Sequence, residues 1–151
     1  MVYTIGEMAK MLNIAPSALR FYDKKGLLPF VERSQGGKRL FQEKDYEWLH
    51  IIHCLKNTGM PLNDIRSFIE MAMKGDETIK PRLELFIKQR DFIRLQIAGL
   101  QETLDILEFK CWYYETADAA GTTSVPRNMA LEDIPEHLQK TRRKLQHLPF
   151  A

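Results

Sequence analysis

Two thiols, Cys54 and Cys111, are the side chains with the most reactive chemistry in this sequence of 151 residues. Cys54 directly follows His53, and His50 precedes it by one turn if the segment is helical. An imidazole or the nearby Lys56 favours the thiolate form of a cysteine, which is both a nucleophile and a metal ligand. The residue types therefore permit three uses of Cys54: a reactive thiol, a metal ligand beside His50 or His53, or an inert, half-buried small side chain.

A catalytic use of Cys54 is not expected. A cysteine nucleophile in an enzyme needs a separate orienting acid and an oxyanion hole, and residues on adjacent turns of one helix do not supply them. Two cysteines are also too few for a disulfide scaffold or for an iron–sulfur cluster held by four thiolates. We therefore expect no enzyme, no cofactor and no metal site.

Basic side chains concentrate at the start of the chain. Residues 1–41 carry seven Lys and Arg against three acidic residues, whereas the whole chain has a net charge of +2. This surplus would suit a polyanion such as a nucleic acid. Charge alone is equally compatible with a solvated basic face, so the interpretation depends on the elements that position these residues.

The same 41 residues predict a helix-turn-helix followed by a β-hairpin. Residues 4–7 fit a capping box, with Thr4 at the N-cap and Glu7 three residues later. A second helix is predicted from Pro16 to Lys25, ended by Gly26. Two β-prone runs then flank a Gly-Gly turn at residues 36–37. A helix-turn-helix with a basic hairpin forms a winged DNA-binding unit.

Two more helices are predicted, over about residues 43–57 and from Pro61 to Gly75. On a helical wheel Cys54 lies about 110° from the centre of the apolar stripe of the first, at the edge of its core face. That stripe consists of Trp48, Ile51, Ile52 and Leu55.

From Ile79 to Tyr114, apolar side chains recur in steps of four and three, which is a heptad seam interrupted only by Arg90 and Cys111. A helix of this length spans roughly 50 Å and cannot bury its seam on so small a domain. We therefore expect a homodimer formed through this helix, with an intramolecular helical hairpin as the alternative.

The predicted fold class is mainly α, in three parts. Residues 1–75 form a winged helix-turn-helix domain with a helix pair, residues 78–114 a dimerisation coiled-coil helix, and residues 115–151 a loop and a short basic helix. The loop is predicted over residues 117–126, and the basic helix ends near Leu148. Its cations, which are expected to be solvated, are Lys140, Arg142, Arg143 and Lys144.

The start of the sequence has no basic segment followed by an apolar core, so no signal peptide is expected. No stretch approaches the roughly 20 apolar residues that span a bilayer. These features favour a cytoplasmic protein without membrane contact.

Five ordered motifs lie within about residues 3–72. They are Tyr3-Thr4-Ile5-Gly6-Glu7, Leu19-Arg20-Phe21-Tyr22-Asp23, Gly26-Leu27-Leu28-Pro29, Arg39-Leu40-Phe41 and Gly59-Met60-Pro61-Leu62-Asn63-Asp64-Ile65. Together they resemble the motifs of the MerR family of bacterial transcription factors, and the heptads extend the resemblance to about residue 114. One departure is Lys38, where the family usually has an aromatic residue before the wing arginine.

The resemblance implies an antiparallel dimer that grips a pseudo-palindromic promoter operator on double-stranded DNA and distorts it for RNA polymerase. Arg20 is then the candidate for reading bases or phosphates, with Ser17 on the first turn of the same helix. Tyr22 would offer its hydroxyl to a phosphate or serve as a core aromatic, and Lys38 and Arg39 would clamp the backbone from the wing.

The resemblance also bears on the effector. Metal-sensing members need a second thiol several residues beyond the position of Cys111, and residues 117–120 supply none. The surroundings of Cys54 are similar to the branch that responds to aldehydes and other thiol-reactive electrophiles, which makes Cys54 the candidate sensor. The alternatives are a small-molecule site at the aromatic cluster Trp112-Tyr113-Tyr114 and a coiled-coil module that binds protein rather than DNA.

Overall fold

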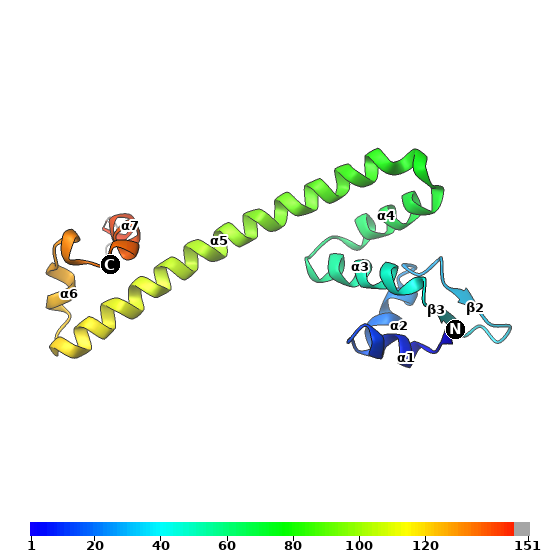
Figure 1. Ribbon diagram of the computed structural model, residues 1–151, viewed down its shortest axis with the longest axis horizontal. Coiled ribbons are helices and arrows are strands. Elements are labelled where there is room, and N and C mark those ends of the chain that lie inside the picture. The colour runs from blue at the N-terminus through cyan, green and yellow to red at the C-terminus, as the bar shows by residue number, and fades with distance from the viewer. Residues whose placement is uncertain (147–151) are drawn as a thin grey trace. The chain divides into compact units, whose positions relative to one another are not determined.

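Residues 1–146 are described in this computed structural model, which is mainly helical (Figure 1). The chain divides into two compact units, Met1–Asp91 and the residues from Phe92 onward. The first contains β1 (Val2–Tyr3), α1 (Ile5–Met11), α2 (Pro16–Lys24), β2 (Glu32–Arg33), β3 (Arg39–Gln42), α3 (Asp45–Asn57), α4 (Leu62–Lys74) and the 3-10 turn η1 (Asp76–Thr78). The boundary falls within α5 (Ile79–Ala120), and α6 (Ser124–Asn128), η2 (Leu131–Asp133) and α7 (Glu136–Leu145) follow.

The predicted helix-turn-helix is confirmed. The Thr4 backbone N–H donates to Oε2 of Glu7 at 2.7 Å, and the Glu7 N–H donates to Oγ1 of Thr4 at 3.3 Å. These bonds are the expected capping box, and the hydrogen bonds from Thr4 lower the pKa of the Glu7 carboxyl. Pro16 opens α2, and Gly26 follows it with a φ of +72°, a conformation that glycine adopts without strain.

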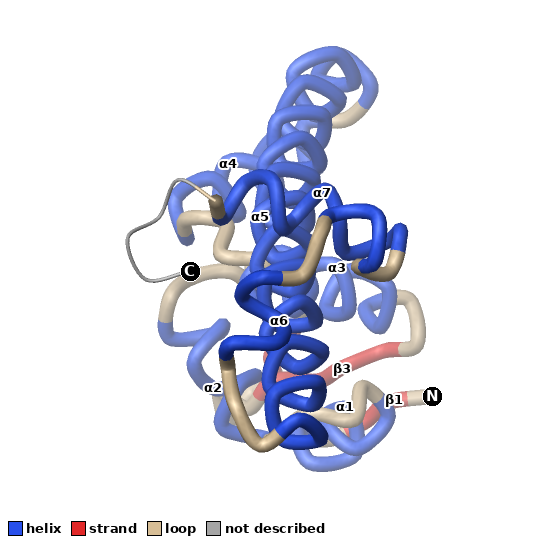
Figure 2. The backbone as a smooth tube through the Cα atoms, turned by 90° about the vertical axis from the view of Figure 1, so that its left-hand side faces the viewer, coloured by secondary structure: helices blue, strands red, loops and turns tan. Residues whose placement is uncertain are grey.

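The predicted hairpin forms the wing. β3 lies at the centre of a three-stranded antiparallel sheet in the order β1-β3-β2, with Tyr3 paired to Phe41 and Arg33 paired to Arg39. Figure 2 shows β1 and β3 as the red segments. At the tip, the Ser34 N–H donates to the Lys38 carbonyl at 2.8 Å. The sheet thus ties the N-terminus, the wing and the start of α3 together.

The core of the first unit lies between the helix-turn-helix, α3 and α4. It includes Leu19, Phe41, Ile52 and Ile65, each with no exposed surface. On α3 the buried face contains Leu49 as well as Ile52 and Leu55, while Ile51 is 37% exposed. The predicted stripe was therefore wrong at Ile51, because Leu49, two residues earlier, occupies the inward position.

This rotation of the buried face moves Cys54. The residue is exposed, on the side of α3 away from Leu49 and Ile52. The expected position at the edge of the core face is thus corrected to the outer face.

An aromatic row and a hydrogen-bonded joint fix the first turns of α5. Ring centroids of Phe30 and Trp48 lie 5.6 Å apart, those of Trp48 and Phe68 5.8 Å, and those of Phe68 and Phe86 5.0 Å. At the joint, the Thr78 hydroxyl donates to the Gly75 carbonyl at 2.8 Å. These contacts hold the start of α5 against α3 and α4.

The long helix is confirmed and extends beyond the predicted end, to Ala120. Its seam side chains are exposed on the single chain: Ile97 by 60%, Leu100 by 71% and Leu104 by 46%. Arg90 lies within the seam and forms an ion pair with Asp91 at 2.9 Å.

The predicted loop over residues 117–126 was wrong. α5 continues through Ala117 to Ala120, since alanine is the strongest helix former, and α6 begins at Ser124. The tail then folds back, and Phe109 and Tyr113 of α5 share a second core with Ile134, Leu138 and Leu145.

The basic helix of the tail is confirmed as α7, although Leu148 lies outside the described residues. Two of its cations, which were expected to be solvated, have partners within the fold. Lys144 pairs with Glu102 at 3.3 Å, and Arg142 donates to the Arg127 carbonyl at 3.0 Å. Across residues 1–146, no helix has the length and apolar character that a membrane span requires.

We expect Leu138→Ala to destabilise the packing of α7 in the second unit and to leave the first unit unchanged. Leu138 is 3% exposed, and truncation of a buried leucine costs about 2–5 kcal/mol. Limited proteolysis should cleave α7 at Arg142 or Arg143 much faster than in the wild type, while amide exchange in α2 stays unchanged. Lys140→Ala, at an exposed position of the same helix, is the matched control. Equal protection of α7 in both variants would contradict the second core.

Candidate nucleic-acid interface and thiol site

The outer face of α2 carries two of the predicted DNA-contacting residues. Ser17 and Arg20 are exposed, whereas Leu19, on the opposite side of the helix, has no exposed surface. The helix is therefore anchored by its apolar side and presents a hydroxyl and a guanidinium to solvent. This arrangement fits a recognition helix that enters a major groove.

Tyr22 takes the core position, the second of its two expected uses. Its side chain is only 2% exposed, and Oη lies 2.6 Å from Nδ1 of His53 on α3. Burial raises the pKa of Tyr22, which further favours the protonated hydroxyl. With its hydroxyl paired and withdrawn from the surface, Tyr22 is not placed to contact a phosphate.

Asp23 joins the end of α2 to both strands of the wing. Arg39 Nε donates to Oδ1 of Asp23 at 2.8 Å, and Arg33 Nη2 lies 3.1 Å from the same oxygen. The side chains of Arg39 and Asp23 are only 15% and 23% exposed, whereas that of Arg33 is 51% exposed. Arg39, expected to clamp the DNA backbone, is therefore placed to brace the wing against the recognition helix.

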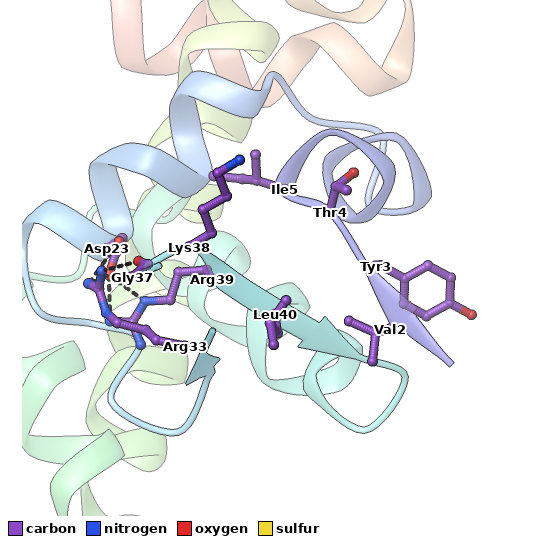
Figure 3. A pocket seen from close by; sticks show the side chains of 10 residues that line it. All are labelled: Val2, Tyr3, Thr4, Ile5, Asp23, Arg33, Gly37, Lys38, Arg39 and Leu40. Atoms are coloured by element: carbon purple, nitrogen blue, oxygen red, sulfur yellow. Dashed lines mark hydrogen bonds and ion pairs between the residues drawn. The ribbon is translucent and has the colours of Figure 1, made fainter. Parts of the chain in front are cut away.

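Lys38 is the wing cation that faces outward. It is exposed and has no ion-pair partner within residues 1–146. In Figure 3 its side chain extends away from the Asp23 cluster, toward Ile5 at the start of α1. A cavity of about 410 Å³ opens here between β1, the start of α1 and the wing. Among the cations predicted to contact DNA, Arg20 and Lys38 are thus exposed, whereas Arg39 is largely buried.

Cys54 lies on the outer face of α3, at the turn that connects this helix to two others. The Thr58 N–H donates to the Cys54 carbonyl at 3.0 Å, and Gln89 Nε2 of α5 donates to Oγ1 of Thr58 at 3.0 Å. On the other side, His53 contacts Tyr22 of α2. The thiol therefore occupies a turn that touches both the recognition helix and the long helix.

The second thiol has a different setting. Cys111 is exposed beside an open groove of about 570 Å³ between α5 and α7. Other side chains that line this groove are Leu104, Leu107, Trp112, His137 and Leu138. No group of three or more potential metal-ligating side chains occurs within the described part of the chain.

Sequence reasoning missed three residues of this site: Asp23, His53 as the partner of Tyr22, and Gln89. Asp23 offered a signal, since it is the single acid among the cations at the end of α2. The pairs Tyr22–His53 and Thr58–Gln89 are each separated by 31 residues, and no local pattern indicates them.

Comparison with known proteins agrees with this geometry. Residues 3–72 match the family model described as "MerR HTH family regulatory protein". Residues 46–108 match the model described as "MerR, DNA binding". The two matches together span the winged unit, the helix pair and most of α5.

Individual relatives cover nearly the whole chain. An uncharacterized HTH-type transcriptional regulator of Haemophilus influenzae is 46% identical over 136 residues, which is 90% of this chain and 98% of that protein. The crystal structure of HiNmlR, "a MerR family regulator lacking the sensor domain, bound to promoter DNA", has a TM-score of 0.76 at 45% identity and covers 86% of this chain and 98% of that one. The HTH-type transcriptional regulator AdhR of Bacillus subtilis is 29% identical over 86 residues, 57% of this chain and 61% of AdhR.

We expect Asp23→Asn to loosen the wing. The substitution leaves the largely buried Arg39 guanidinium without its counter-charge, at a cost of about 1–3 kcal/mol in the free energy of unfolding. Urea denaturation measures this loss, and amide exchange should quicken at Ser34 and Arg39. Glu32→Gln is the matched control, because Glu32 pairs with Lys44 at 3.8 Å with both side chains more than half exposed. Unchanged wing exchange in Asp23→Asn would show that the ion pair does not brace the hairpin.

Proposed function

Because this chain belongs to the MerR family of DNA-binding transcriptional regulators, we propose that it is an effector-switched regulator whose sensor is the Cys54 thiol. A homodimer binds a pseudo-palindromic promoter and presents it to RNA polymerase, and a thiol-reactive electrophile changes its DNA-distorting state. The observation that carries this proposal is the position of Cys54, exposed on a turn that touches both α2 and α5.

The DNA contacts follow from exposure and charge. Arg20 and Ser17 on α2 read the major groove, and Lys38 contacts a phosphate from the wing. Arg39 acts indirectly, since its pairing with Asp23 holds the wing at a fixed angle to α2. HiNmlR, bound to promoter DNA, supports this mode of binding by its similarity over most of the chain.

The charge pattern of α5 supports an antiparallel dimer. Residues 79–96 carry five basic and two acidic side chains, whereas residues 97–120 carry five acidic and one basic. Antiparallel pairing of two copies places each basic half against an acidic half, and parallel pairing would place like charges together. The exposed seam supplies the apolar contact, and the charge pattern sets its direction.

The sensing step is an addition at sulfur. Formaldehyde would accept the Cys54 sulfur at its carbon, and the thiol proton would end on the carbonyl oxygen, giving a hydroxymethyl thioether without oxidation or reduction. The adduct adds bulk to the outer face of α3 beside Ile51, which is 37% exposed. In the dimer this change alters the packing between the reading unit and the long helices.

Sensing within the reading unit agrees with the similarity of this chain to HiNmlR. HiNmlR, which lacks the sensor domain, aligns over 98% of its own length with this chain. The similarity to AdhR and HiNmlR supports the branch of the family that the motif around Cys54 resembles. We infer that the switch acts through residues that also build the DNA-binding fold, and that modification is stoichiometric rather than catalytic.

We expect formaldehyde or methylglyoxal to induce promoter transcription by about 5- to 100-fold with the wild-type protein, the range of a typical allosteric coupling. Cys54→Ser should abolish this induction with operator binding retained, and Cys111→Ser should leave it intact. In vitro transcription with purified polymerase measures all three. Mass spectrometry should find one adduct per subunit and no turnover of aldehyde.

A response that survives Cys54→Ser would overturn the assignment of the sensor. It would favour the groove beside Cys111 and Trp112 as a small-molecule site. A failure of the wild type to respond to either aldehyde would overturn the electrophile as effector, while leaving DNA binding in place.

The dimer orientation can be tested by charge exchange. Lys80 and Glu115 are exposed and occupy equivalent heptad positions at opposite ends of the seam. We expect Lys80→Glu to weaken the dimer about tenfold, because two symmetric contacts become repulsive. Adding Glu115→Lys should restore the wild-type dissociation constant, measured by analytical ultracentrifugation. Failure of the second change to restore it would contradict antiparallel pairing at these ends.

A further inference from the structure

We propose that His53 is a positioning residue that couples the Cys54 turn to the recognition helix through Tyr22. The inference rests on the thiol switch proposed above and identifies its route to the DNA-reading surface. The direct observation is a contact of 2.6 Å between Tyr22 Oη and His53 Nδ1, which joins α2 to α3 across 31 residues of sequence.

Both ring nitrogens of His53 have partners. Nδ1 faces the Tyr22 hydroxyl, and Nε2 lies 2.9 Å from the amide of Asn57, one turn further along α3. The Asn57 atom is the amide nitrogen Nδ2, which only donates, so Nε2 is the acceptor of the ring and Nδ1–H donates to the Tyr22 hydroxyl. The ring is therefore held at both ends, and a displacement of the α3 turn moves the partner of Tyr22 with it.

Tyr22 cannot easily replace this partner. Its side chain is 2% exposed, so water does not reach the hydroxyl freely. A buried hydroxyl that loses its hydrogen bond costs more than an exposed one, which gives α2 a reason to follow His53. Separation of the pair is thus disfavoured, and a shared movement of the two helices is favoured.

Two residues close to Tyr22 on α2 are the proposed DNA contact Arg20 and the wing anchor Asp23. Arg20 lies two positions earlier on α2, and Asp23 follows directly. Asp23 in turn accepts a hydrogen bond from Arg39 of β3. A small rotation of the last turns of α2 at Tyr22 therefore moves both the base-reading side chain and the anchor of the wing.

A second contact from the same α3 turn provides an internal comparison. Lys56 Nζ lies 5.8 Å from the ring centroid of Phe21, which is a weak cation–π contact at the surface. The two contacts start from residues on either side of Cys54 on α3, His53 and Lys56. They reach two adjacent residues of α2, Tyr22 and Phe21. The hydrogen bond is the shorter and more buried of the two, so it carries the coupling.

The experiment uses the full-length dimer with Cys111→Ser, so that Cys54 is the reactive thiol. Iodoacetamide forms an S–C bond at Cys54, with iodide as the leaving group and the thiol proton released to solvent. Amide chemical shifts are then compared before and after alkylation. We expect shifts both in α3 around residues 55–58 and in α2 over residues 17–24.

Tyr22→Phe keeps the buried ring and removes only the hydroxyl. We expect it to reduce the α2 shifts at least about threefold, as loss of one hydrogen bond allows, while the α3 shifts persist. His53→Leu should act in the same way, and His53→Asn, which keeps a polar atom near the place of Nδ1, should retain most of the α2 shifts. Lys56→Met is the matched control and should leave them unchanged.

Equal α2 shifts in the wild type and in Tyr22→Phe would overturn the proposal, and so would wild-type shifts confined to α3. An equal loss in Lys56→Met would show a general loosening of the α2–α3 contact rather than a route through His53. The readout does not depend on which electrophile acts in the cell. The aldehyde transcription assay can therefore fail while this coupling stands, or succeed while it falls.

Discussion

The apolar seam of α5 is the constraint on which the rest of the structure depends. A single helix of 42 residues leaves Ile97 and Leu100 more than half exposed, and no other element described here covers them. Burial of that surface requires a second copy, and the opposite charges of the two halves of α5 favour an antiparallel one. A symmetric pair of reading units follows from this requirement, and so does recognition of a symmetric DNA site.

Within the reading unit, polar contacts between helices are few and specific. The aromatic row from Phe30 to Phe86 packs α3, α4 and the start of α5 together through apolar contacts, which are non-directional. Hydrogen bonds and ion pairs add direction, among them Asp23 to the wing, His53 to Tyr22, Gln89 to Thr58, and Arg66 of α4 to the Lys25 carbonyl at the end of α2. Because two of these links involve the last turns of α3, a chemical change at Cys54 occurs where the helices are coupled rather than at a remote surface.

Much of the fold could be predicted from local sequence. The capping box at Thr4, the glycine after α2 and the heptads of α5 each encode structure within a few residues. The buried face of α3 could not be predicted, because Leu49 and Ile51 are both apolar and only tertiary packing determines which of them is buried. The folded-back tail was missed for a similar reason, since its core joins Phe109 to residues about 25–36 positions later. At the site, Arg20 and Lys38 are exposed, and their DNA contacts stay predictions, whereas the partners of Arg39 and Tyr22 lie too far away in sequence to be inferred.

The pairing of Asp23 with two arginines also affects the thermodynamics of DNA binding. Each cation that replaces a condensed counterion on a phosphate releases that ion, and the number released sets how steeply affinity falls with salt. Arg39 is already neutralised by a carboxylate within the fold, so it releases no ion of its own when the wing approaches DNA. The wing therefore gains rigidity from a charge that no longer contributes to the ionic-strength dependence of DNA binding, whereas an exposed cation that contacts a phosphate, as proposed for Lys38, still contributes to it.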